Sequence, residues 1–339
     1  MKKTTENTKK PNKERFVGFE LEYAAVPLNT SASIIQKLFG GDVHKNTEAE
    51  WVVSDTCFGT FRLEIDAEPI KALAEALPVN TNHTTGILGD IYTATAEKTV
   101  EAISDIGTKI VPFEIVTPPV PIDKIKDLDA LRKALFLAFA EDTKSSFYNA
   151  FGLHINPDVI STDSHNILHH IQAFSLLYPW LRDVHEMDRA RSLSAYAEPY
   201  PNEYVEHIIA VNYKPSIEEL IKDYHTFNPT RNRALDMLPL FAHLEPELIK
   251  ELYGTDEKIN ARPTFHYRLP NCEVSSGAWS LMKEWSRWLL VEETAGNQSR
   301  LFQLCDAWHQ DREKRKSWLL SDDTHWKQCI ENIMGQKHA

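Results

Sequence analysis

Cysteine and glycine are both scarce in this chain of 339 residues. Its four cysteines are widely separated and form no CxxC pair, so neither a disulfide framework nor a sulfur-based zinc site is indicated. Such cysteine usage fits a reducing compartment, and we expect a cytoplasmic location. Only 12 glycines occur, and the phosphate-binding patterns GxGxxG and GxxxxGK[ST] are both absent. Any nucleotide must therefore bind without either of these phosphate-binding loops.

Long apolar runs and an excess of basic residues are missing as well. No hydrophobic stretch approaches the roughly 18 residues of a membrane span, and the opening MKKTTENTKKPNKE lacks the apolar segment of a signal peptide. Acidic residues outnumber basic ones by 49 to 37, which gives a net charge of -12. Because nucleic acid and anionic membranes both require a basic face, we expect neither as a partner. Residues 1–14 are predicted to form a disordered tail.

Enough apolar sequence is present for a large core, since 42% of the residues are hydrophobic. Alternating or continuous apolar runs predict strands at 16–26, 50–53, 60–66, 109–116, 149–156 and 264–269. Apolar recurrence every three or four residues predicts helices at 32–38, 69–77, 90–106, 123–139, 164–180, 217–224, 233–244, 277–291 and 300–318. This order of elements predicts an α+β fold, in which helices pack on one face of a mainly antiparallel sheet.

Two glutamates interrupt the otherwise apolar and aromatic strand RFVGFELEYA at residues 15–24. Side chains alternate between the two faces of a strand, so Glu20 and Glu22 share one face, with roughly 7 Å between their attachment points. Phe19 and Leu21 point to the opposite face. The strand therefore has one apolar face and one acidic face.

The same alternation recurs in the other predicted strands. The polar face carries Arg62, Glu64 and Asp66 in TFRLEID, Glu114 in KIVPFEIVTPP, His154 and Asn156 in NAFGLHIN, and His266 and Arg268 in TFHYRLP. Solvent exposure of one face is the ordinary explanation for any single strand. Several carboxylates together repel one another unless cations or arginines lie among them, and oxygen ligands with an imidazole suit Mg²⁺ or Mn²⁺. We therefore expect a metal-binding face.

The ordered segments FGFELE, RLEID, FEIVTPP, FGLHIN, NPTRNRALDMLPL and RPTFHYRLP resemble the family of putative amidoligases. The opening strand is also similar to the GxExE strand of carboxylate-amine ligases with the glutamine synthetase and glutamate-cysteine ligase fold. The resemblance covers about residues 15–295. It implies a catalytic domain over 15–295, like that of glutamine synthetase, with a curved sheet and a C-terminal helical extension at 296–339 packed on the same domain.

The resemblance also implies roles for individual residues. The implied metal ligands are Glu20, Glu22, Glu64, Glu114, His154 and His266. The implied nucleotide-binding residues are His154, Asn156 and Arg62. Arg268 resembles the arginine that meets the transferring phosphoryl group, and Arg231 or Arg233 resembles an arginine supplied by the preceding loop and helix start. The family's last strand usually reads Glu-x-Arg, and His266 replaces that glutamate here.

The implied activity is ATP-dependent joining of a carboxylate to an amine through an acyl phosphate, with Mg²⁺ or Mn²⁺ as cofactor. Divalent ions and arginines neutralise the charge that spreads over the phosphoryl oxygens during such a transfer. The substrates would be small amino acids, amines or a peptide end, and a homo-oligomer is compatible with this fold. The alternatives are a degenerate member that binds a nucleotide or an acidic partner without turnover, and a metal-dependent hydrolase.

Three further features have ordinary explanations. His165 and His169 stand four residues apart, as zinc ligands on a helix do, but no HExxH accompanies them and a solvated or capping role is expected for these and His170. Cys57 is expected to be a half-buried thiol. Core packing is expected for the C-terminal tryptophans Trp279, Trp285, Trp288, Trp308 and Trp318.

Overall fold

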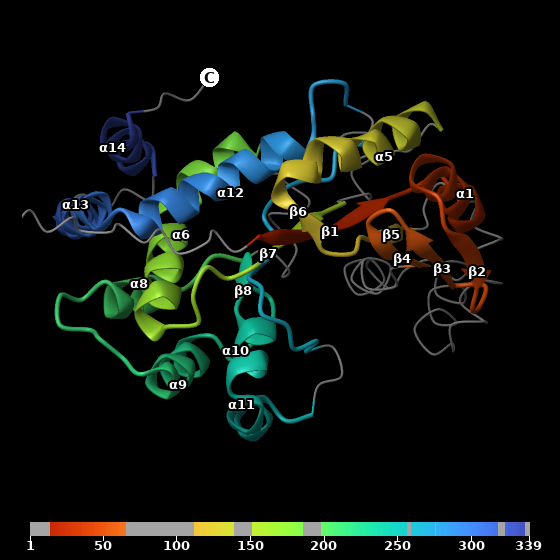
Figure 1. Ribbon diagram of the computed structural model, residues 1–339. Helices are drawn as coiled ribbons and strands as arrows, with labels where there is room; N and C mark the ends of the chain where they lie inside the picture. The colour runs from red at the N-terminus through yellow and green to blue at the C-terminus, as the bar shows by residue number, and fades with distance from the viewer. Residues whose placement is uncertain are drawn as a thin grey trace, which may run out of the picture.

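The structure is a computed structural model, and it describes residues 14–65, 112–138, 151–185, 198–255, 259–274, 276–317 and 323–335. The predicted helices at 69–77 and 90–106 lie outside these ranges, as do Asp66, Trp318 and nearly all of the predicted tail. The described residues form an α+β fold around one sheet (Figure 1). The predicted fold class is confirmed at this level.

The sheet is built from antiparallel strand pairs. Its strands are β1 (Phe16–Tyr23), β2 (Asp42–Lys45), β3 (Glu50–Thr56), β4 (Gly59–Ile65), β5 (Phe113–Val116), β6 (Val120–Pro121), β7 (Leu153–Pro157), β8 (Leu235–Asp236) and β9 (His266–Tyr267). The spatial order is β2-β3-β4-β5-β1-β7-β9-β8, and β6 pairs with one end of β1. Every pair of these strands is antiparallel. The first strand of the chain therefore lies near the middle of the sheet, between β5 and β7.

The helices are α1 (Leu28–Phe39), a 3₁₀ turn η1 (Ile122–Lys124), α5 (Ile125–Leu137), α6 (Ser164–Val184), α8 (Asn202–Ile208), α9 (Ile217–Phe227), α10 (Leu238–Leu244), α11 (Pro246–Tyr253), α12 (Leu281–Gly296), α13 (Gln298–Ser317) and α14 (Thr324–Met334). In Figure 1, α5 and α12 lie on one side of the sheet, whereas α10 and α11 extend from β8 on the other side. None of the described helices is both long and apolar enough to cross a membrane.

Helices cover the apolar face of the sheet, α1 over Phe61 of β4 and α6 and α12 over Tyr267 of β9. Phe19 and Leu21 of β1 are fully buried, as the alternation predicts. The ring of Tyr267 on β9 lies 5.8 Å from Phe174 of α6 and 5.3 Å from Trp288 of α12, measured between ring centroids. Aromatic side chains bury large apolar areas, so these contacts fix the helices on this face. The opposite face of the sheet carries the predicted polar residues.

Local capping signals mark several helix starts. Asp163 precedes α6, and its carboxylate accepts from the backbone N–H groups of His165 and Asn166. Ser216 and Glu219 form a reciprocal capping box at the start of α9. Such side chains satisfy backbone donors that have no partner inside the helix. The positions of these two helices are therefore encoded locally in the sequence.

The predicted helix at 233–244 is wrong in its first half. Leu235–Asp236 is the edge strand β8, and α10 begins only at Leu238, with a proline in its first turn. A fully apolar run has no period that distinguishes a buried strand from a buried helix. Arg231 and Arg233 consequently lie in an irregular segment before β8, and not at a helix start as predicted.

Candidate metal-binding site

Four glutamates face one another across four adjacent strands. Glu50 of β3 is paired in register with Glu64 of β4, Glu64 with Glu114 of β5, and Glu114 with Glu22 of β1. Directly opposed residues of an antiparallel pair lie on the same face of the sheet with Cβ atoms about 5 Å apart. Like charges in this arrangement repel each other. The row is therefore a site of concentrated negative charge that favours a cation.

His154 of β7 lies between Glu22, a member of this row, and Glu20 of the same strand. It is paired in register with Glu20 of β1. Its Nδ1 lies 2.8 Å from Oε2 of Glu20, and its Nε2 lies 3.4 Å from Oε1 of Glu22. Both nitrogens of one imidazole ring therefore face carboxylate oxygens of the same strand.

Two groups of side chains on this face have the geometry of metal ligands. Glu20, His154 and His266 form one group, and Glu22, Glu114 and His154 form the other. Within each group, one ligand atom from each residue lies within 4.8 Å of the others. The structure thus brings together five of the six residues predicted as metal ligands. Among the described residues, Glu64 belongs to neither group, although it is paired in register with Glu114.

Arg262 also reaches this face, and the sequence analysis missed it. Its Nη2 donates to Oδ1 of Asn156 at 2.8 Å and to Oε1 of Glu20 at 3.2 Å. Asn156 in turn donates from Nδ2 to the same oxygen of Glu20 at 2.9 Å. Arg262 lies in the irregular segment before β9, so no strand alternation marks it. Its position as the first residue of the segment RPTFHYRLP was the available signal.

Glu22 is held by the backbone of the neighbouring segment. Its Oε2 accepts a hydrogen bond of 2.6 Å from the N–H group of Gly152, just before β7. The Glu22 side chain is only 10% exposed. A buried carboxylate that accepts a backbone hydrogen bond has a fixed orientation, so Oε1 is directed toward His154.

The last strand of the polar face carries a second buried network. Arg268 donates from Nη2 to Oδ2 of Asp236 at 2.8 Å, and Asp236 is fully buried. Nδ1 of His266 lies 3.5 Å from the same oxygen, and Nε of Arg268 donates to Nδ1 at 3.4 Å. Asp236 is not among the predicted site residues, because it lies in the stretch predicted to be a helix. Asp236 thus contacts both His266 of β9 and Arg268, which directly follows this strand.

The carboxylates and the imidazole have shifted pKa values. Burial raises the pKa of Glu20, but nearby His266 and His154 outweigh it and hold this pKa well below its usual range. Burial also raises the pKa of Asp236, but Arg268 and His266 outweigh burial, and this pKa is lowered. For His154, burial prevails over its carboxylate neighbours and lowers the pKa. Ionised carboxylates beside a neutral imidazole are the protonation states that metal binding requires.

The arginines predicted to supply positive charge have different surroundings. Arg233 donates to Oε2 of Glu198 at 2.9 Å and to Oδ1 of Asn228 at 2.8 Å, and its side chain is 10% exposed. Arg231 is half-buried, and Arg62 is exposed on β4, paired in register with Val116. Arg233 therefore has an ion-pair partner of its own in Glu198.

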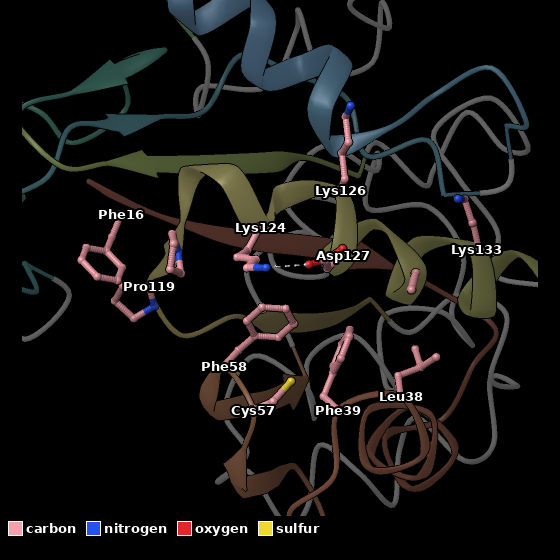
Figure 2. Close-up of a pocket in the computed structure, with 12 residues that line it drawn as sticks. Phe16, Leu38, Phe39, Cys57, Phe58, Pro119, Lys124, Lys126, Asp127 and Lys133 are labelled. Carbon is pink, nitrogen blue, oxygen red and sulfur yellow. Dashed lines mark ion pairs between the residues drawn. The ribbon is translucent and has the colours of Figure 1, made fainter. Parts of the chain in front are cut away.

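The cavity in Figure 2 is separate from the polar face. It has a volume of about 810 Å³ and is bordered by α1, α5, β6 and the turn between β3 and β4. Figure 2 shows Lys124 turned toward Asp127, and the two charged groups are 3.6 Å apart. Cys57 also lines this cavity and is exposed, not half-buried as predicted. None of the predicted site residues lines it, so the cavity is not the candidate site.

The histidines of α6 form no metal-ligand group within the described part of the chain. His165 is exposed, as expected. His170 is buried against Phe265, with ring centroids 4.9 Å apart, so the expected solvated or capping role is wrong for this residue. The core role predicted for the C-terminal tryptophans is confirmed for the described ones, Trp279, Trp285, Trp288 and Trp308.

The polar face of this antiparallel sheet combines carboxylates, imidazoles and arginines, and two groups of its residues could hold a metal ion. A family model described as "Putative amidoligase enzyme" matches residues 13–290. The chain belongs to this family, as its ordered strand motifs indicated. No curated protein and no solved structure matches the chain.

Proposed function

We propose that this protein is an ATP-dependent ligase that joins a carboxylate to an amine, using Mg²⁺ or Mn²⁺. The observation that carries the proposal is the convergence of Glu22, Glu114 and His154 on one point of the sheet face opposite α6 and α12. Membership of the amidoligase family supports the same reaction. On this proposal the sheet corresponds to the catalytic sheet of the glutamine synthetase fold, and the protein acts in the cytoplasm.

The donor set fits a divalent ion that binds phosphate oxygens. Two carboxylates and one imidazole lie within reach of one ion, and hard oxygen ligands are those that Mg²⁺ and Mn²⁺ accept. A bound ion would supply charge neutralisation to the phosphates of ATP. Glu22, Glu114 and His154 would hold the ion, while the backbone N–H of Gly152 keeps Glu22 in its orientation.

The reaction has two group transfers. An oxygen of the substrate carboxylate attacks the γ-phosphorus of ATP, ADP leaves, and an acyl phosphate forms. The amine nitrogen then attacks the acyl carbon, phosphate leaves, and the nitrogen loses a proton as the amide forms. Arg268 would stabilise the transferring phosphoryl group, and Arg62, His154 and Asn156 would border the nucleotide. The amine and carboxylate would be small amino acids, amines or a peptide end.

One observation favours a second candidate, a member that binds nucleotide without turnover. Arg268 is held by Asp236, and His266 stands where the family usually has a glutamate. A neutral imidazole adds no negative charge to the site. The two functions make different predictions for ATP consumption.

The test is a screen of amino acids and amines for stimulated formation of ADP, with Mg²⁺ or Mn²⁺ present. ADP formation that requires both an added carboxylate and an added amine supports the ligase. ATP binding without ADP formation under all substrate pairs supports the second candidate. Hydrolysis of an amide in the absence of ATP would instead indicate a metal-dependent hydrolase.

A further inference from the structure

Arg262 belongs to a segment that is anchored on both sides. Its backbone N–H donates to the carbonyl oxygen of Pro239 on α10 at 3.0 Å. Two residues further on, Thr264 forms an antiparallel bridge with Asp158, which directly follows β7. A residue between two such contacts has a fixed backbone position. The side chain of Arg262 therefore extends from a defined point beside the polar face.

The guanidinium of Arg262 makes its hydrogen bonds through one nitrogen. Nη2 donates to Oδ1 of Asn156 at 2.8 Å and to Oε1 of Glu20 at 3.2 Å. Arginine can only donate, so the amide oxygen of Asn156 faces it, and Nδ2 of Asn156 donates to Glu20 at 2.9 Å. Together these contacts fix the plane of the guanidinium.

The other N–H groups of Arg262 have no acceptor in the part of the chain that the structure describes. Nη1 makes no hydrogen bond there, and Nε is buried without a partner. The side chain is 23% exposed, so it can be reached from solvent. A guanidinium carries its donors in a planar fork that matches the paired oxygens of a carboxylate or phosphate. Arg262 is therefore preorganised to receive an oxyanion.

Arg268, the arginine predicted to meet the phosphoryl group, is less accessible. Its side chain is 8% exposed and lies beside fully buried Asp236. The carboxylate beside Arg262 is shared with a further group, because Oε2 of Glu20 lies 2.8 Å from Nδ1 of His154. Arg262 therefore presents more accessible positive charge than Arg268 to a molecule that approaches this face.

We propose that Arg262 is a substrate-binding residue, whose Nη1 binds an oxygen of a carboxylate or phosphate while Glu20 and Asn156 hold the guanidinium in position. This inference rests on the proposed function and deepens it, because ATP and the carboxylate substrate both bring oxyanions to the polar face. The carboxylates of this face repel an anion unless a cation is bound among them, so we expect the binding to require Mg²⁺.

The test uses inorganic phosphate as the probe and measures its binding to the full chain by isothermal titration calorimetry, with Mg²⁺ present. Arg262→Gln removes the charge and should weaken phosphate binding at least about tenfold, as expected for a hydrogen bond to a charged group. Arg262→Lys keeps a point charge and should weaken it less. Lys222→Gln, which removes an exposed positive charge on α9, is the matched control and should leave phosphate binding unchanged.

A second titration, with a saturating ATP analogue that cannot be cleaved, identifies the source of the oxyanion. Phosphate that no longer binds assigns the position at Arg262 to the phosphates of the nucleotide. Phosphate that still binds, and still requires Arg262, assigns the position to the carboxylate substrate. Both results support the inference.

Wild-type affinity for phosphate in Arg262→Gln, or no phosphate binding by the wild type, overturns the inference. Formation of ADP is measured separately, so the two proposals can fail independently. Turnover of Arg262→Gln at the wild-type rate leaves the ligase standing and removes Arg262 from it. Phosphate binding that requires Arg262, without ADP formation under all substrate pairs, leaves the anion site standing and removes the ligase.

A measurement on the wild type decides if the variants of Arg262 do not fold. Phenylglyoxal modifies accessible arginines, and peptide mass spectrometry locates the modified residue. Phosphate with Mg²⁺ should protect Arg262 from modification. Equal modification with and without phosphate overturns the inference.

Discussion

Nη2 of Arg268 lies 2.8 Å from Oδ2 of Asp236, and neither side chain is more than 8% exposed. Asp236 belongs to the edge strand β8, and Arg268 directly follows β9, which pairs with β8. Asp236 also caps the next helix by accepting from the N–H of Leu238 at 3.0 Å. One carboxylate therefore fixes both the candidate phosphoryl-binding arginine and the start of α10.

We expect Asp236→Asn to lower the free energy of unfolding by about 3 kcal/mol. The substitution leaves the guanidinium of Arg268 without its buried counter-charge, and breaking a buried ion pair on one side has a cost of this size. Urea denaturation at neutral pH measures the change. Asp306→Asn, at an exposed position on α13, is the control and should stay within about 0.5 kcal/mol of the wild type. A similar loss in both variants would contradict the buried-pair argument.

Glu22→Gln is expected to abolish ATP turnover, with a fall of roughly 100-fold or more, and to leave folding largely intact. The amide oxygen of glutamine can still accept from the N–H of Gly152, but the charge directed at His154 is lost. Steady-state ADP formation and thermal unfolding of the same preparation measure the two effects. Unchanged turnover would remove Glu22 from the site.

Arg268→Lys should reduce the turnover number more than it changes the KM for ATP. Lysine retains one positive charge near Asp236 but replaces a planar fork with a point charge, which cannot contact two phosphoryl oxygens at once. We expect a fall in kcat of about 1000-fold, as for other arginines that act on a transferring phosphoryl group. Steady-state kinetics with varied ATP measure both constants. Equal effects on both would argue against a role in the transition state.

Acid should destabilise the protein through His170. Burial lowers the pKa of His170 below its ordinary value of 6.5, despite the opposing contact with the carbonyl of Asn166. The unfolded chain therefore binds the proton more readily, so stability is full above about pH 6.5 and falls as the pH drops from there toward the lower folded-state pKa. Urea midpoints at pH 7 and pH 5 measure the loss.

The matched variants for this prediction are His170→Leu and His243→Leu. His170→Leu should show a smaller loss of stability between pH 7 and pH 5 than the wild type, because the buried titrating ring is gone. His243 is exposed on α10, so its replacement should leave the pH dependence unchanged. A wild-type-like loss in His170→Leu would assign the acid sensitivity to other groups.

Strand faces could be predicted from the sequence because side-chain alternation is strict. Glu20, Glu22, Glu114 and His154 each follow a period of two within a strand, and the pairing of β1 with β5 and β7 brings them together. Antiparallel neighbours of a central strand keep like faces aligned. The strand faces that carry these residues were therefore predictable from the local pattern, whereas their grouping into one site was implied only by the family resemblance.

The residues that the sequence did not reveal lie outside regular alternation. Arg262 reaches Glu20 from an irregular segment 242 positions further along the chain, and no local pattern encodes such a contact. Asp236 lies in a strand of two residues inside a longer apolar run, where strand and helix periods cannot be told apart. Pro239, in the first turn of α10, was the available sign that the helix begins late.

Strand β2 is one edge of the described sheet, and its composition affects how copies of this protein can associate. Strand β2 has only four residues, Asp42–Lys45, and three of them are exposed. It includes an acid, a histidine and a lysine, whose solvation opposes the docking of another β-strand along this edge of the described sheet. Copies of the protein that self-associate would therefore be expected to meet through side-chain surfaces, and not by joining their sheets at β2.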